Sequence, residues 1–160
     1  MQAEPQREHR WLEKLVGEWT YETECVMGPD QPPMKAEGRE TVRSLGGLWT
    51  IAEAEGAMPT GDEPMKSVMT LGFDPASRRF VGTFIASVMA HLWTYDGSLD
   101  ADEKVLSLNA EGPSCTGSGT AKYVDRIEFV DDDHRTLTSR VLGEDGNWVE
   151  FMRAEYRRTK

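Results

Sequence analysis

From residue 18 onward the chain alternates between apolar and polar side chains, and this period of two constrains the fold more than any other feature of the sequence. The segment LVGEWTYETECVM, residues 15–27, shows the alternation most clearly. The two sets of alternate positions are Trp19, Tyr21, Thr23, Cys25 and Met27 on one side, and Glu18, Thr20, Glu22 and Glu24 on the other. Such a pattern is typical of an antiparallel strand with one face in the core and one face in water.

Further segments of strand-like composition follow at short intervals, and compact turns rather than long helices separate them. They cover residues 35–45, 48–56, 66–73, 79–86, 91–99, 104–111, 120–131, 134–143 and 147–158. A meander of about ten antiparallel strands avoids exposed edges best by closing on itself. We therefore expect an all-β fold in which residues 18–158 form a closed, lipocalin-like barrel.

A short amphipathic helix is expected before the first strand, in QREHRWLEKLV at residues 6–16. Its apolar side chains recur at helical spacing, and Gly17 ends the pattern. The chain of 160 residues is then a single barrel domain, 1–160, long enough to bury a core without disulfides or metals.

The junction between helix and barrel carries a Gly-x-Trp pattern, formed by Gly17 and Trp19. Gly17 permits the turn, and we expect Trp19 to point inward and fill one end of the barrel. A guanidinium from the last strand would then cover the indole, which stabilises closure by about 0.5–2 kcal/mol. The last strand offers Arg153, Arg157 and Arg158, and we favour Arg157.

The formal net charge of −10 at pH 7 restricts the partners of the protein. An acidic surface argues against nucleic acid and against an anionic membrane. No segment approaches the roughly 20 apolar residues of a membrane helix. The N-terminal residues MQAEPQREHRW do not resemble a secretory signal. We therefore expect a cytoplasmic protein with no nucleic-acid partner and no membrane partner.

The two cysteines, Cys25 and Cys115, fit neither a disulfide framework nor a metal-binding spacing. We interpret them as reduced thiols. No metal and no cofactor are expected from the sequence.

Several segments taken together resemble one family. They are WLEKLVGEWTYE, GPDQPPM, RSLGGLWTIAEAEG, SVMTLGFDP, RRFVGTFIASVMAHLWTYDGSLD, LNAEGPS, IEFVDDDHRTLTS and EFMRAEYRR, and they extend from residue 11 to residue 158. On these segments the chain resembles the uncharacterised family called domain of unknown function 1579. The Gly-x-Trp after a short helix, followed by a meander of about ten strands, also resembles the calycin group of lipocalins, fatty-acid-binding proteins and nitrobindins. The resemblance implies a lipocalin-like barrel, but it implies no activity and no catalytic residues.

The candidate binding residues centre on FIASVMAHLWTYDG, residues 84–97. A tight bend near residues 87–90 would separate two strands, and His91, Trp93 and Tyr95 would then share one face of the second strand. A mostly apolar wall with one imidazole and one phenol is typical of a small-molecule site. The same side chains would also suit a barrel that fills its own interior.

Neighbouring strands offer further lining residues. Met69 and Phe73 share one face of the fourth strand, and the third strand presents inward either Trp49 with Ile51 or Leu48 with Thr50. Our candidate set includes Trp49.

Glu53 has the parity of Trp49, so it lies inside the barrel if Trp49 does. An inward carboxylate needs a partner or a raised pKa. Arg43 on the preceding strand could be that partner, and we favour a structural ion pair over catalysis.

Three classes of function remain open from the sequence. The favoured one is binding of a small apolar or aromatic molecule inside the barrel. The second is an isomerase, cyclase or hydrolase that uses His91, Tyr95 or Glu53 as acid or base, although no nucleophile–base motif is present. The third is a structural or interaction module that forms a homodimer. A haem-binding role like that of nitrobindins would rest on fold likeness alone.

Overall fold

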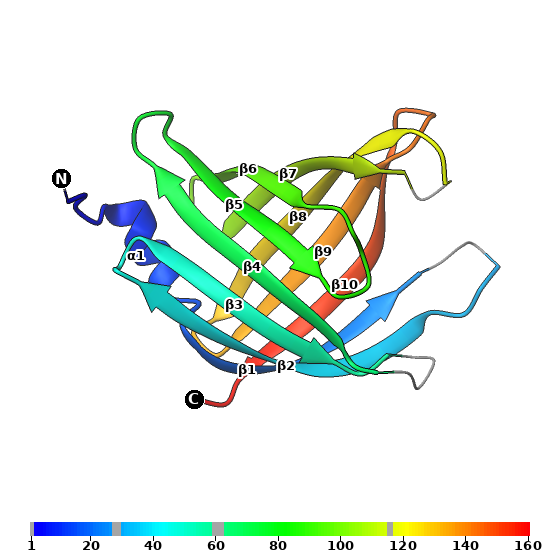
Figure 1. Ribbon diagram of the computed structural model, residues 1–160, viewed down its shortest axis with the longest axis horizontal. Helices are drawn as coiled ribbons and strands as arrows, with labels where there is room; N and C mark the ends of the chain where they lie inside the picture. Colours follow the sequence, from blue (N-terminus) through cyan, green and yellow to red (C-terminus); the bar gives the residue numbers. More distant parts are fainter. Residues whose placement is uncertain (1, 27–29, 59–62, 115–116) are drawn as a thin grey trace.

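The protein forms one short helix and ten strands in a continuous antiparallel meander (Figure 1). The computed structural model describes residues 2–26, 30–58, 63–114 and 117–160. The elements are α1 (Arg7–Glu13), β1 (Gly17–Cys25), β2 (Met34–Leu45), β3 (Trp49–Gly56), β4 (Met65–Asp74), β5 (Arg79–Ala86), β6 (Trp93–Leu99), β7 (Val105–Pro113), β8 (Thr120–Asp131), β9 (His134–Leu142) and β10 (Trp148–Arg158).

The meander closes because β1 pairs with β10 as well as with β2. The strand order around the barrel is β1-β10-β9-β8-β7-β6-β5-β4-β3-β2. No strand in this order has a free edge, which removes the risk of pairing with another chain. The all-β barrel with a short N-terminal helix, expected from the alternation and the turn spacing, is confirmed.

The two ends of the barrel differ. Helix α1 lies across one end, which we call the closed end (Figure 1). The opposite end, where β5, β7 and β9 finish, is the open end. In the part of the chain that the structure describes, no helix has the length and apolar character needed to span a membrane.

The short helix is fixed to the closed end by two buried side chains. The Trp11 indole donates a hydrogen bond to the Glu103 carbonyl at 2.6 Å, and its ring meets Phe129 edge-on at 5.4 Å. His9 Nδ1 accepts the backbone N–H of Gln6 at 2.9 Å. The proton of that imidazole is therefore on Nε2, which lies 3.0 Å from the Phe73 carbonyl and donates to it.

The largest fully buried side chains gather in the half of the barrel beside α1. They are Trp19, Phe80, Leu12, Leu106 and Leu108. Each strand residue among them lies within a few positions of the closed end of its strand. The core therefore fills the closed half, and cavities lie along the rest of the interior.

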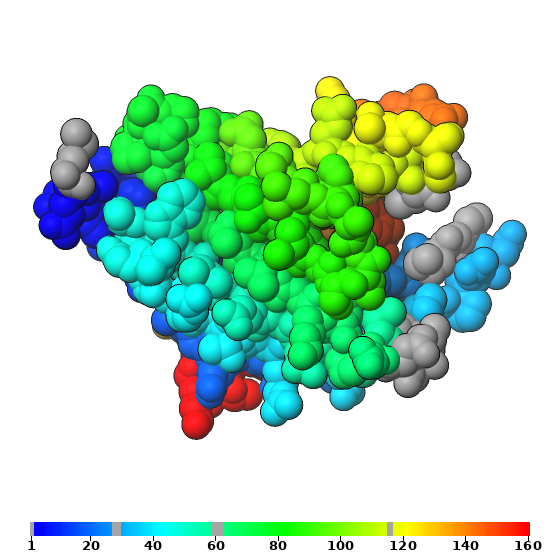
Figure 2. All heavy atoms as spheres, viewed as in Figure 1, coloured from blue at the N-terminus to red at the C-terminus, as the bar shows by residue number. Residues whose placement is uncertain are grey.

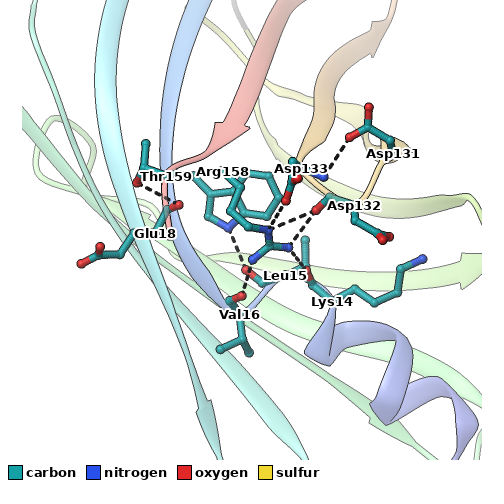
Figure 3. A network of polar contacts seen from close by, with 10 residues as sticks. Lys14, Leu15, Val16, Glu18, Asp131, Asp132, Asp133, Arg158 and Thr159 are labelled. Atoms are coloured by element: carbon teal, nitrogen blue, oxygen red, sulfur yellow. Dashed lines mark hydrogen bonds and ion pairs between the residues drawn. The ribbon is translucent and has the colours of Figure 1, made fainter.

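Trp19 fills the barrel as expected, with 1 % of its surface exposed, but the arginine that covers it is not Arg157. The guanidinium of Arg158 lies 4.3 Å from the Trp19 ring centroid. It also donates to the carbonyl oxygens of Val16 at 2.7 Å and Lys14 at 2.8 Å (Figure 3). The expectation of Arg157 was wrong because β1 and β10 pair Trp19 directly with Arg158, so these two side chains share a face.

Gly17 adopts a φ of +143°, which non-glycine residues rarely reach. A Cβ at this position would lie 2.5 Å from Arg158 Nη1 and 2.6 Å from the Lys160 carbonyl oxygen. The glycine is thus required by the turn and by the close approach of the arginine that closes the barrel.

Candidate functional site

The barrel interior widens at the open end into a cavity of about 760 Å³, which we call the mouth chamber. Figure 2 shows the surface indented at this end, between the yellow segment near residue 120 and the light-blue segment near residue 32. The chamber is lined by Phe84, Met89, Ala90, His91, Trp93, Tyr95, Ala110, Pro113, Tyr123, Asp125, Ser139 and Phe151.

One wall of the mouth chamber is a series of rings that meet edge to face. His91 and Trp93 have ring centroids 4.6 Å apart, Trp93 and Tyr123 are 5.1 Å apart, and Tyr123 and Phe151 are 6.1 Å apart. The interplanar angles lie between 79° and 85°. This arrangement suits the ring quadrupoles and leaves apolar surfaces for a flat ligand.

Two backbone features make room for this wall. The register of β10 against β9 shifts between Glu150 and Met152, so Phe151 is an extra residue in the strand and lines the chamber. On β7, a Cβ at Gly112 would lie 2.4 Å from the Trp93 ring and 2.9 Å from His91 Nε2. A larger residue at position 112 would push both rings out of place.

One acidic side chain, Asp125 of β8, faces this apolar chamber. Its Oδ2 accepts the Tyr95 hydroxyl at 2.6 Å, and its Oδ1 accepts the Ser139 hydroxyl at 2.6 Å. Burial raises the pKa of Asp125, and the two hydroxyl hydrogen bonds oppose this rise without cancelling it. The carboxyl is thus held in place by neutral donors from two other strands, β6 and β9.

Tyr95 donates its hydroxyl hydrogen to this carboxyl because the phenol stays protonated. Burial, and then the charge of Asp125, raises the pKa of Tyr95 far above its ordinary value. Only 6 % of Tyr95 is exposed. Tyr95 therefore acts here as a fixed hydrogen-bond donor and not as a base.

His91 supplies the second polar group of the chamber. Its Nε2 atom is buried and has no hydrogen-bond partner among the described residues. A buried ring nitrogen without a partner is costly unless a ligand or water completes it. This nitrogen lies close to Gly112, where an added Cβ would be 2.9 Å away, so a bound molecule reaches it only if the His91 ring turns.

A smaller interior cavity of about 210 Å³, which we call the inner cavity, extends along the β1–β4 side of the barrel, from Leu15 near the helix to Cys25 and Met65 at the open end. Phe84 borders both this cavity and the mouth chamber, so its ring stands between them. The remaining lining is Leu15, Tyr21, Thr23, Cys25, Glu40, Val42, Thr50, Ala52, Ala54, Met65, Ser67, Met69, Leu71, Ile127, Arg135, Leu137, Met152, Ala154 and Tyr156.

The polar side of the inner cavity is a buried ion pair between Arg135 and Glu40. The Arg135 guanidinium lies 4.0 Å from the Tyr156 ring centroid and 4.5 Å from that of Trp19. Its charge is thus balanced by one carboxylate and by two aromatic faces. Burial, and then the charge of Glu40, raises the pKa of Tyr156, so this phenol is also neutral.

The structure places the predicted site residues in different parts of the barrel. His91, Trp93 and Tyr95 come together in the mouth chamber, at the bend that was expected near residues 87–90. Met69 lies apart from them in the inner cavity. Phe73 is buried at the closed end, with its ring 5.0 Å from Phe80, so it contributes to the core and not to either cavity.

Trp49 and Glu53 lie on the outer surface, which corrects their expected inward orientation. Trp49 is 41 % exposed and rests against Gly72, its direct partner on β4. The alternate residues of β3, among them Thr50 and Ala52, line the inner cavity. Glu53 does form an ion pair with Arg43, at 3.8 Å, but on the outer face.

Sequence reasoning missed Asp125, Tyr123, Ser139 and Phe151. The sequence does contain a signal for Asp125 and Tyr123. The alternate positions of β8 that share one face are Tyr123, Asp125, Ile127 and Phe129. An aspartate within an otherwise apolar face indicates a buried carboxyl. Phe151 gave no such signal, since its orientation depends on the bulge in β10.

The described residues hold no group of three His, Cys, Asp or Glu side chains that could bind a metal ion. Cys25 is a free thiol, and burial raises its pKa. Cys115, the other predicted thiol, lies outside the described residues.

Comparison with known proteins identifies a family and a fold. The family model described as "Protein of unknown function (DUF1579)" matches residues 4–158. No curated protein matches the chain.

Solved structures share the barrel at low sequence identity. Rv2717c from M. tuberculosis is 12 % identical, with a TM-score of 0.63 over 98 % of this chain and 100 % of that one. The S-type phycobiliprotein lyase CPES from Guillardia theta is 14 % identical and has a TM-score of 0.64. The match covers 97 % of this chain and 94 % of the lyase chain. EF1p2_mFAP2b bound to DFHBI is 12 % identical and has a TM-score of 0.51. The match covers 94 % of this chain and 98 % of the EF1p2_mFAP2b chain. At these identities the likeness shows the fold alone.

Proposed function

The chain belongs to the DUF1579 family of proteins of unknown function, and we propose that it binds a small aromatic molecule in the mouth chamber. The observation that carries this proposal is a cavity of about 760 Å³ walled by aromatic side chains. Sites for small molecules have volumes of roughly 300–1,000 Å³, mostly apolar walls and a few polar groups that fix orientation. The chamber has this size, this wall, and the polar groups of His91 and Asp125.

The location of the core supports the same proposal. A small barrel ordinarily fills its interior with its own side chains. Here the largest fully buried side chains lie in the closed half, and the open half retains a cavity. The barrel EF1p2_mFAP2b, which shares the fold, is bound to DFHBI, so a barrel of this kind can hold a small molecule.

Filling the chamber tests the proposal. Ala110 of β7 lines it, and Ala110→Phe would occupy space that the ligand needs. Titration with Nile red, a neutral dye that fluoresces in apolar sites, should give saturable binding to the parent protein. We expect Ala110→Phe to weaken that binding at least about tenfold, the effect of losing roughly 1.4 kcal/mol.

Thr94→Phe is the matched control, because Thr94 lies on the exposed face of β6. This variant adds a ring of the same size outside the barrel and should leave the dye affinity unchanged. Equal dye binding to the parent and to Ala110→Phe would show that the dye sits elsewhere and would contradict the proposal.

A second candidate function, acid–base catalysis, is favoured by one observation. Asp125 combines a raised pKa with a position in the wall of the chamber, and such a carboxyl can exchange a proton with a bound molecule. Glu53 has no part in this, since it lies outside the barrel. Mass spectrometry of a molecule recovered with the protein, before and after incubation, distinguishes the two candidates: an enzyme changes the molecule and a binding protein returns it unchanged.

A further inference from the structure

Asp125 differs from the other buried acidic group of the barrel interior. Glu40 is paired with the Arg135 guanidinium. Asp125 has only the neutral hydroxyls of Tyr95 and Ser139, and none of the ion pairs among the described residues includes it. A buried carboxylate without a cation is unfavourable in the free protein. It is favourable once a cation is placed against it.

The walls around Asp125 suit the same kind of partner. Trp93, Tyr123 and Phe151 surround the chamber with aromatic rings, and no lysine or arginine is among its lining residues. Ring faces attract cations, and they do so more strongly where water is excluded. A carboxylate among aromatic rings is therefore complementary to a nitrogen cation on an apolar body.

We propose that the mouth chamber selects an aromatic molecule that carries a protonated amine or amidine, with the nitrogen bound at Asp125. This inference rests on the proposed function and specifies its ligand class. The net charge of −10 acts in the same direction, because an acidic protein attracts cations and repels anions. Tyr95 and Ser139 hold the carboxylate oxygens in place, and each oxygen retains a lone pair for the ligand's N–H groups.

The proposal gives binding a defined pH dependence. Burial raises the pKa of Asp125, so the free protein keeps the carboxyl proton to a higher pH than an exposed aspartate does. A bound cation favours the ionised carboxylate. Affinity should therefore rise as the pH increases through this raised pKa and then level off, and below it binding should release a proton.

The other titratable groups around the chamber come from three elements. Tyr95 of β6 and Tyr123 of β8 line it, His91 precedes β6, and the charge of Asp125 helps to raise the pKa of Tyr156 on β10. The pKa of Tyr95 and that of Tyr156 are raised by burial, so both phenols stay neutral through this range. The titration is repeated in His91→Gln, so that the pH dependence of the variant reports on Asp125 without the imidazole.

The experiment compares three probes with the same naphthalene ring. The first is 1-naphthylmethylamine, which is a cation at neutral pH. The second is 1-naphthalenemethanol, which is neutral, and the third is the carboxylate of 1-naphthaleneacetic acid, which is an anion. Calorimetry of the full chain should show the amine binding at least about tenfold more tightly than the alcohol, and the acetate binding most weakly. In Asp125→Asn the amine should bind no more tightly than the alcohol binds to the same variant, so the tenfold preference should disappear.

Tyr95→Phe provides a second test that keeps the carboxyl. The Tyr95 hydrogen bond lowers the pKa of Asp125, so its removal should move the midpoint of the amine's pH dependence to higher pH. An unchanged midpoint would contradict the role given to Asp125.

The outcomes separate this inference from the function on which it rests. If amine and alcohol bind equally well, the chamber is a binding site for aromatic molecules and the preference for a cation is wrong. If none of the three probes binds, the proposed function fails and the inference fails with it. Amine binding that survives in Asp125→Asn would also overturn the inference.

Discussion

At the scale of single residues, Arg158 connects the last strand of the barrel to the start of the first strand. Its guanidinium covers the Trp19 ring and donates to the carbonyls of Lys14, Val16 and Asp132 (Figure 3). It also pairs with Asp133 at 3.2 Å. These partners come from the helix–strand junction and from the β8–β9 turn, so one side chain connects three segments.

Arg158→Ala should therefore destabilise the protein far more than Arg157→Ala. The first variant leaves several carbonyls without a donor and uncovers the indole, for an expected loss of about 2–4 kcal/mol. Arg157 is exposed and pairs opposite Thr20, so its loss should be within roughly 0.5 kcal/mol. Urea denaturation of both variants measures the difference. Equal losses would mean that the contacts of Arg158 contribute little to stability.

At the scale of elements, helix α1 covers the closed end of the barrel. It is short for an independent helix, since isolated helices of fewer than about 12–15 residues are marginal in water. Its stability therefore comes from contacts with the sheet, above all from Trp11, which is 5 % exposed. The helix observed at Arg7–Glu13 is shorter than the predicted 6–16, because the apolar spacing continues beyond the last helical turn into Leu15 and Val16.

Trp11→Ala should consequently cost about 3–5 kcal/mol, the usual range for deleting a buried tryptophan. Trp148→Ala is the matched control, because Trp148 is 44 % exposed and should cost less than about 1 kcal/mol. Thermal or urea denaturation gives both values. A small loss for Trp11→Ala would indicate that the barrel is stable without its helix.

The strands and their order could be predicted from the sequence because alternation and turn residues are local signals. All ten strands and the bend before Trp93 follow from them. Which face of a strand points inward depends on register, and register is set by partners far along the chain. This is why Trp49 and Glu53 were placed on the wrong side, and why Arg157 was chosen in place of Arg158. His91, Trp93 and Tyr95 could be grouped because they occupy alternate positions of one short segment.

At the scale of the whole molecule, each of the two interior cavities contains a group of buried polar side chains. The mouth chamber contains Asp125 with its two hydroxyl donors, and the inner cavity contains the Arg135–Glu40 pair. The site in the inner cavity is already neutralised within the protein, whereas the one in the mouth chamber is not. Phe84 lines both cavities, so its ring lies between the space at the mouth and the space beside the ion pair.

Phe84→Ala should join the two cavities and change the length of ligand that the barrel accepts. In the parent protein, 1-naphthalenemethanol and the longer 6-(1-naphthyl)hexanol should differ in affinity only by the contacts that the hexyl chain of the ligand makes at the mouth of the barrel. In the variant the hexyl chain can enter the inner cavity, where each buried CH₂ contributes about 0.8 kcal/mol. We expect the ratio of the affinity for the longer alcohol to that for the shorter one to be at least about tenfold higher in the variant than in the parent.

Ile85→Ala, which truncates an exposed neighbour on the same strand, should leave this ratio unchanged. Calorimetry of both alcohols with the three proteins measures the ratio, and a parent-like ratio in Phe84→Ala would show that Phe84 does not separate the two cavities.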